Sequence, residues 1–195
     1  DKISVALVSP EVVSLLRTHT EPTLAGKVNE LFSGAETDSA KLEMEITRLA
    51  RLVEAKTGSP YTGKKLFTTS CAACHKLFEQ GGQIGPDLST YQRDDIDTML
   101  LHIVNPSAEI REGYENFLLT TKDGRTVVGF LVEKDNQTVV LRGLDGQDIS
   151  LERKDIKTMN AQGVSLMPAG LLTGYTDDQV RDLMAYLRST QPLNN

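Results

Sequence analysis

The hydrophobic pattern of this 195-residue chain changes its period twice, near residue 114 and near residue 160. Outside these points apolar residues recur roughly every three to four positions, as in amphipathic helices. Between Tyr114 and Met159 short β-branched segments alternate with polar residues, and the turn dipeptides Asp123-Gly124 and Asp145-Gly146 separate them. We therefore expect about four or five antiparallel strands in a meander, curled into a small sheet or barrel, between helices.

The first 58 residues predict a helical leader without chemically reactive groups. Spacing and helix-start residues indicate three helices: a short one after Pro10, a second from Pro22 to a stop at Gly34, and a third from near Asp38 that ends before Gly58. The chain starts without a methionine and without the basic and apolar segments of a signal peptide. We therefore expect either a mature protein or a piece of a longer one.

Residues 59–195 predict a second domain, which contains the strands of 114–159. Helices are expected from Tyr61 up to the two cysteines, over 94–105 with Asp94 or Asp95 as the cap, and over 176–187. The last helix should carry Val180, Leu183, Met184 and Leu187 on its inner face. The middle helix should end at an Asn-Pro pair, because a residue that precedes proline is disfavoured in the helical conformation. The chain is therefore predicted to be α+β and mainly helical, with a small sheet before the last helix.

The composition excludes several classes of function. A net charge of -6 and a pI of about 5.1 argue against a surface that binds nucleic-acid phosphates. No run approaches the roughly 18 apolar residues of a membrane-spanning helix. The chain has two cysteines, too few for a disulfide-rich scaffold.

Both cysteines lie in Cys71-Ala72-Ala73-Cys74-His75, and Cys-x-x-Cys-His is the attachment signature of c-type haem. Two thiols at this spacing, near the end of a helical turn, can reach the two vinyl groups along one edge of the porphyrin. His75 then falls beneath the iron and supplies the proximal nitrogen. We therefore expect one haem c, attached through Cys71 and Cys74.

Three other interpretations of this segment are weaker. A thioredoxin-like redox pair would follow a strand in a β-α-β context, which the pattern lacks. A structural zinc site needs four ligands, and besides His75 the chain has only His19 and His102 as histidines. A disulfide between Cys71 and Cys74 would close a very small loop and stabilise the fold little.

The surroundings of the motif resemble the class I cytochrome c family. The segment 85–88, Gly-Pro-Asp-Leu, follows His75 closely, and in that family a Gly-Pro-x-Leu segment places the proline carbonyl to accept the N–H of the proximal histidine. Such a bond fixes the tautomer and orientation of the ring. The resemblance implies this role for Pro86, and packing on the haem face for Leu88.

The same resemblance implies that two helices cross beside the haem. In the family an N-terminal helix with a glycine and an aromatic residue crosses the C-terminal helix, and Gly63 and Phe67 match the first. Leu183 and Tyr186, in the last predicted helix, match the second.

The sixth ligand of the iron is expected on the far side of the haem. Of the five methionines, Met167 stands before Pro168 in a loop ahead of the last helix. Class I cytochromes similarly carry Met-Pro in that place, so the resemblance implies Met167 as the ligand. The alternative is His102, which would make a bis-histidine haem.

The β segment departs from ordinary class I cytochromes. With it, residues 60–190 closely resemble the haem-binding c-type domain of the Planctomycetes–Verrucomicrobia kind. The matching segments are CAACH, GPDL, HIVNPSAEIREGYE, TKDGRTVVGFL, LMPAGL and DLMAYLRS. In that family the domain often ends a long polypeptide with a dehydrogenase-like propeller and helical repeats. By resemblance, residues 1–58 would be the end of an upstream helical-repeat region.

Together these features predict an extracytoplasmic, periplasmic monohaem cytochrome c that carries single electrons and is not itself an enzyme. The expected donor is a dehydrogenase in the same or a partner chain, and the expected acceptor is another cytochrome or an oxidase. Two alternatives stay open. One is a haem enzyme or a gas or redox sensor with a labile sixth ligand, and the other is a docking module whose β segment binds a partner.

Overall fold

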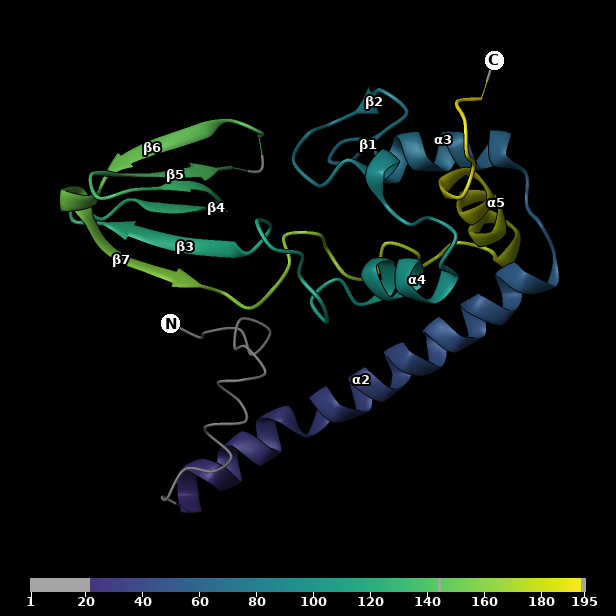
Figure 1. Ribbon diagram of the computed structural model, residues 1–195. Coiled ribbons are helices and arrows are strands. Elements are labelled where there is room, and N and C mark those ends of the chain that lie inside the picture. Colours follow the sequence, from purple (N-terminus) through teal and green to yellow (C-terminus); the bar gives the residue numbers. More distant parts are fainter. Residues whose placement is uncertain (1–21, 144, 194–195) are drawn as a thin grey trace.

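The computed structural model describes residues 22–143 and 145–193, which form a mixed α+β fold (Figure 1). The predicted α+β class is confirmed. The helices and a five-stranded antiparallel sheet lie at opposite ends of the molecule. In chain order the elements are α2 (Pro22–Ala55), α3 (Pro60–Ser70), β1 (Lys76–Leu77), β2 (Gln80–Gly81), η2 (Leu88–Thr90), α4 (Ile96–Val104), β3 (Asn116–Thr121), β4 (Thr126–Lys134), β5 (Thr138–Arg142), β6 (Asp148–Glu152), η3 (Arg153–Asp155), β7 (Ile156–Ala161) and α5 (Asp177–Leu187).

Helix α2 corrects the expected leader. Residues Pro22–Ala55 form one continuous helix instead of two, and Gly34 does not end it. A glycine inside a helix costs only about 1 kcal/mol relative to alanine, so the helix-forming residues on both sides carry the helix through it. The short helix expected after Pro10 lies outside the described residues. The C-terminal part of α2 joins the core through Leu49 and Val53.

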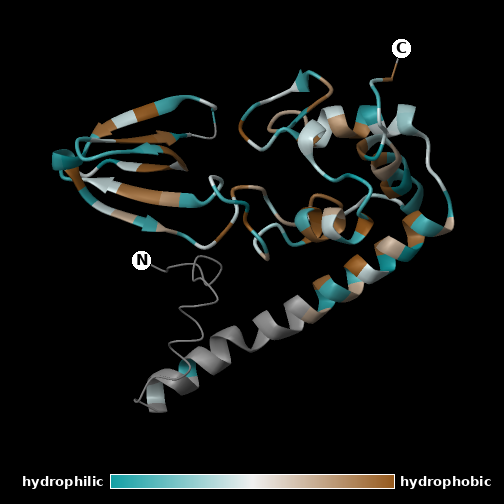
Figure 2. Ribbon diagram, in the orientation of Figure 1, coloured by the Kyte–Doolittle hydropathy of each residue, from teal (hydrophilic) through white to brown (hydrophobic). Residues whose placement is uncertain are grey.

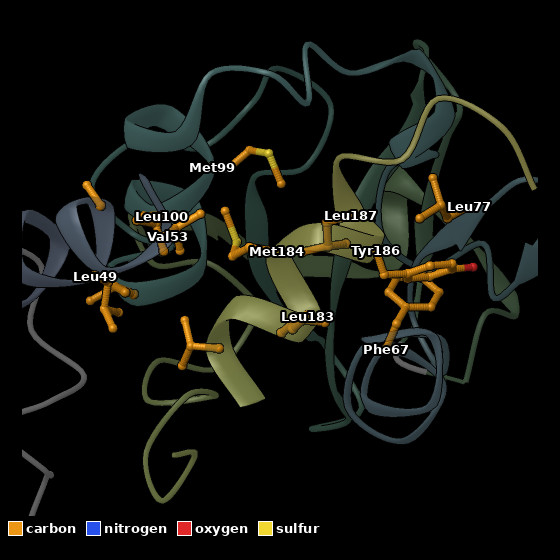
Figure 3. Packing of buried hydrophobic residues seen from close by; sticks show 13 residues of the cluster. Leu49, Val53, Phe67, Leu77, Met99, Leu100, Leu183, Met184, Tyr186 and Leu187 are labelled. Carbon is orange, nitrogen blue, oxygen red and sulfur yellow. The ribbon is translucent and has the colours of Figure 1, made fainter. Parts of the chain in front are cut away.

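Helices α3 and α5 cross where Gly63 leaves no side chain in the contact. A Cβ atom on Gly63 would lie 1.8 Å from the backbone oxygen of Asp182, so only glycine lets the two backbones come this close. One turn later the rings of Phe67 and Tyr186 pack with their centroids 5.4 Å apart (Figure 3). These contacts are the crossing that the family resemblance implies.

The three helices around this core begin at capping side chains. Ser59 caps α3, and Asp95 rather than Asp94 caps α4 by accepting from the Thr98 N–H. Thr176 caps α5 in a capping box with Gln179. These side chains accept N–H groups that have no partner inside the helix. The inner face of α5 is the one that the spacing predicts, with Val180, Leu183, Met184 and Leu187 all buried.

The sheet is a meander in its first four strands and then departs from one. Strands β3 to β6 each pair with the next, but β7 pairs with β3 on the opposite edge, which gives the order β6-β5-β4-β3-β7. In a flat sheet the two edges would lie about 19 Å apart. The short connection through η3 spans about 14 Å at most, so the sheet must curl to bring its edges together.

The curled sheet has its own core and starts and ends at one place. The core consists of Leu119, Val139, Leu141 and Leu151, with partly buried residues such as Met159 packed against it. The Gln162 N–H donates to the Asn116 oxygen at 2.8 Å, so the chain leaves the sheet beside the point where it enters. The sheet therefore attaches to the helical part at a single pair of neighbouring strand ends.

Hydropathy follows this division (Figure 2). Apolar residues cover most of α4 and alternate with polar ones along the strands, while the last turns of α2 are apolar on one side. Across residues 22–143 and 145–193, no helix combines the length and the hydropathy that crossing a membrane requires.

Candidate functional site

A largely apolar cavity lies between the end of α3, helix α4, the loop before α5 and the near end of the sheet. It offers about 260 Å³ to the centres of water molecules. Its lining includes all seven of the residues singled out in the sequence: Cys71, Cys74, His75, Pro86, Leu88, His102 and Met167. These residues span nearly a hundred positions of the chain, and the fold brings them to one place.

The end of α3 presents the cysteines to the cavity. The N–H groups of Cys71 and Ala72 both donate to the Phe67 oxygen, and those of Cys74 and His75 donate to the Cys71 oxygen. These tight turns end the helix and turn the Cys-x-x-Cys-His segment toward the cavity. Both cysteines are free thiols.

His75 is held by the Gly85-Pro86 turn. Its Nδ1 lies 3.0 Å from the Pro86 oxygen, which can only accept, so Nδ1 carries the proton and Nε2 keeps its lone pair. The Gly85 N–H donates to the Cys74 oxygen, and a Cβ on Gly85 would lie 2.6 Å from His75 Cε1. Burial lowers the pKa of His75, although the Pro86 bond opposes this. The arrangement keeps a neutral imidazole with one nitrogen free to bind a metal.

The thiols differ from those of a redox-active cysteine pair. Burial raises the pKa of Cys71 to about 11, and the neighbouring Cys74 adds to the effect. Reactive Cys-x-x-Cys pairs have lowered pKa values, so this environment does not favour thioredoxin-like chemistry. Within the described ranges, no three His, Cys, Asp or Glu side chains gather in a way that could hold a metal ion.

Two methionines of the described residues reach the cavity, Met167 from the loop before α5 and Met99 from α4. The Met167 N–H donates to Ser165 Oγ, and the Ser165 N–H donates to Ser107 Oγ, both at 3.1 Å. These bonds tie the Met167 loop to the segment that follows α4. Met44 is 71% exposed, Met184 is fully buried in the helical core, and Met159 packs in the sheet.

His102 lines the same cavity and has a carboxylate beside it. Its Nε2 lies 3.6 Å from Glu109 Oε2, and its ring meets that of Tyr91 edge to face at 6.2 Å between centroids. The cavity is therefore lined by two thioethers, those of Met99 and Met167, and by the imidazole of His102, and each is a candidate ligand.

Arg93, Tyr114 and Phe130 also line the cavity and were not singled out in the sequence. Arg93 donates to the backbone oxygens of Leu187 and Ser189 at 2.8 and 2.7 Å, while its buried Nε has no partner among the described residues. A buried N–H without an acceptor is costly. The groups that fit a haem are instead the two thiols, the Nε2 of His75 and the apolar lining of the cavity.

Residues 61–141 match the sequence profile of the family described as Cytochrome c. The match covers α3, the Cys-x-x-Cys-His segment, α4 and the first three strands of the large sheet. The class that this match supports is a c-type cytochrome.

Domains of this class typically hold covalently bound haem c and act as electron-transfer modules that meet redox partner proteins. Such a module is compatible with a protein that is not an enzyme. Among curated proteins, none matches the chain.

Proposed function

We propose that this chain is a monohaem cytochrome c that carries single electrons, with His75 and Met167 as the two iron ligands and Cys71 and Cys74 as the attachment points. The observation that carries this proposal is the fixed ring of His75. Its Nδ1 is bound by Pro86, and its Nε2 is free in a cavity that both thiols and the Met167 loop also line.

Bound haem c supplies the one-electron couple of its iron, and the residues of the chain set how easily that couple is reduced. Pro86 holds the His75 ring and increases its basicity through the Nδ1 bond. The thioether of Met167 favours the reduced iron compared with a second nitrogen ligand. The apolar lining keeps water away.

The cellular setting is a further part of the proposal. Attachment of haem to two thiols takes place outside the cytoplasm, so we place the protein in the periplasm. The resemblance to the Planctomycetes–Verrucomicrobia domain supports a dehydrogenase as donor, in the same or a partner chain, and another cytochrome or an oxidase as acceptor. The net charge of -6 favours partners with a basic patch.

The ligand assignment is tested by optical spectroscopy of the ferric protein, produced with its haem attached. We expect a low-spin spectrum with the far-red sulfur-to-iron charge-transfer band, and loss of that band in Met167→Ala. Met44→Ala is the matched control, because Met44 is 71% exposed and distant from the cavity lining. If instead Met99→Ala or His102→Ala removes the sixth ligand, the assignment to Met167 is wrong.

The pair of His102 and Glu109 favours a second candidate, a haem enzyme or gas sensor with a labile sixth ligand. An imidazole with a carboxylate beside it can move a proton at the iron. This candidate predicts a high-spin ferrous protein that binds CO readily without any substitution. A ferrous protein that is low-spin before CO is added, and whose spectrum CO leaves unchanged, excludes it and leaves electron transfer.

A further inference from the structure

We propose that the β-sheet unit, residues 116–161, forms one wall of the haem pocket through Phe130, with Tyr114 beside it, and so keeps water from the iron. This inference rests on the proposed function. It assigns the sheet a role within the electron-transfer site itself, in place of a role only in docking a partner.

The first observation is that Phe130 is buried although it lies on the face of β4 that is turned away from the core of the sheet. Side chains alternate along β4, and Leu131 points into the core of the sheet with its neighbour Leu141. Phe130 therefore points away from that core, as Val128 does. Val128 is 39% exposed, whereas Phe130 is only 7% exposed. Something outside the sheet covers Phe130.

Side chains around the cavity, with Tyr114 nearest in ring contact, supply that cover. Phe130 and Tyr114 line the cavity together with His75 and Met167. The two aromatic rings meet nearly perpendicularly, with centroids 5.4 Å apart. Tyr114 lies two residues before β3, in the segment that leads from α4 into the sheet. The pair thus stands where the helical part and the sheet join, and a haem in the cavity would meet it.

The turn before β6 lies near the same cavity from another side. Gly146 belongs to this turn, and a Cβ atom added to it would lie 3.8 Å from Ile84 Cγ1. Ile84 belongs to the glycine-rich loop before Pro86 and lines the cavity. In Figure 1 the near ends of β3 and β6 face the helical part of the molecule. The sheet therefore comes close to the cavity lining at a second place besides Phe130.

An apolar wall has a definite effect on the iron. Oxidised haem iron carries one more positive charge than reduced iron, and water stabilises the more charged state. Excluding water therefore raises the reduction potential, since solvent exposure is one of the factors that set it. It also slows the entry of small ligands that compete with Met167.

The test compares Phe130→Ala with Val128→Ala in the protein with haem attached. Two quantities are measured: the reduction potential, and the rate at which cyanide binds the ferric form. For Phe130→Ala we expect a lower potential and cyanide binding at least about tenfold faster, which corresponds to a barrier lower by about 1.4 kcal/mol. Val128→Ala removes a similar apolar group from the same face of the same strand and should leave both values unchanged.

Phe130→Leu keeps an apolar side chain at the wall and should restore most of the potential. If Phe130→Ala does not fold, Tyr114→Ala is measured in its place, and a wild-type potential and cyanide rate in Tyr114→Ala overturns the proposal. The same result in Phe130→Ala overturns it and favours a sheet that only docks a partner. Absence of a c-type haem spectrum in the unsubstituted protein would instead overturn the proposed function.

Discussion

The helical part and the sheet complete their cores in different ways. The sheet packs Leu119, Val139, Leu141 and Leu151 among its own strands. The helical part has a larger core, but α3, α4 and the Met167 loop also face a cavity of about 260 Å³. The core of the sheet is therefore filled by side chains of its own strands, whereas the helical part needs a large apolar group to fill its cavity.

We expect the largest effect when the haem is not attached. Cys71→Ser with Cys74→Ser prevents attachment of haem and leaves the apolar cavity without the group that fills it. The residues around it then lose packing partners, and we expect the helical part to lose stability. We expect backbone amides of α3 and α5 to lose protection from hydrogen exchange, while amides of β4 and β5 keep more of theirs.

Hydrogen exchange followed residue by residue by NMR measures this difference directly. Equal loss of protection in both parts would contradict the comparison, since it would mean that the sheet depends on the haem as much as the helices do. The protein with haem attached is the control, and it should show high protection in α3, α5 and β4 alike.

The crossing of α3 and α5 is the next most sensitive point of the helical part. In Gly63→Ala the new Cβ would meet the Asp182 oxygen at 1.8 Å, so the helices must separate. We expect a loss of about 3 kcal/mol or more, at the upper end of the cost of overpacking. Urea unfolding of the protein with haem attached measures it. Thr62→Ala, one residue earlier and exposed, should change stability by less than about 0.5 kcal/mol.

In the sheet the corresponding change is Leu141→Ala. Leu141 is fully buried, and we expect a loss of about 2.5 kcal/mol, low in the range for such truncations because a small core can partly collapse. The haem spectrum should stay unchanged, because Leu141 points away from the cavity. Val132→Ala, with Val132 45% exposed, is the control in the neighbouring strand. A change in the haem spectrum would show that the two parts are not independent.

Features that depend on residues close together in the sequence were predictable, whereas contacts between residues far apart in the sequence were not. A cap at Asp94 or Asp95, the buried face of α5 and the Cys-x-x-Cys-His segment each follow from spacing over a few positions, and the structure shows that Asp95 is the cap. The pairing of β7 with β3 was not predictable, because the alternation of apolar residues indicates a curled meander or barrel but does not show which strands pair at its edges.

The cavity residues show the same limit. Nothing in the sequence around Arg93 indicates its role, because its partners, the backbone oxygens of Leu187 and Ser189, lie more than 90 positions away. The sequence predicts Phe130 only as part of a strand. Its place in the cavity lining depends on which face of β4 meets the helical part. The notion that Gly34 ends a helix failed because one glycine is a small penalty within a long helix.

The smallest expected effect is a loss of stability at acidic pH, and it can be followed separately in the helical part and in the sheet. In α4, Asp95 accepts from the N–H and hydroxyl of Thr98, and these bonds lower the pKa of Asp95 below its ordinary 3.8. In the turn between β4 and β5, Asp135 accepts from the N–H groups of Thr138 and Gln137, and its pKa is lowered likewise.

A lowered pKa means that the unfolded state binds protons first as the pH falls. The stabilisation by each aspartate is therefore present at neutral pH and is lost as the pH falls through its lowered pKa. The amide signals of Thr98 and Thr138 should report these transitions in an NMR titration, each with a midpoint below 3.8. Asp95→Asn should remove the transition at Thr98 and leave that at Thr138, and Asp135→Asn should do the reverse. If either substitution removed both transitions, the helical part and the sheet would titrate as one unit, and the division between them would fail.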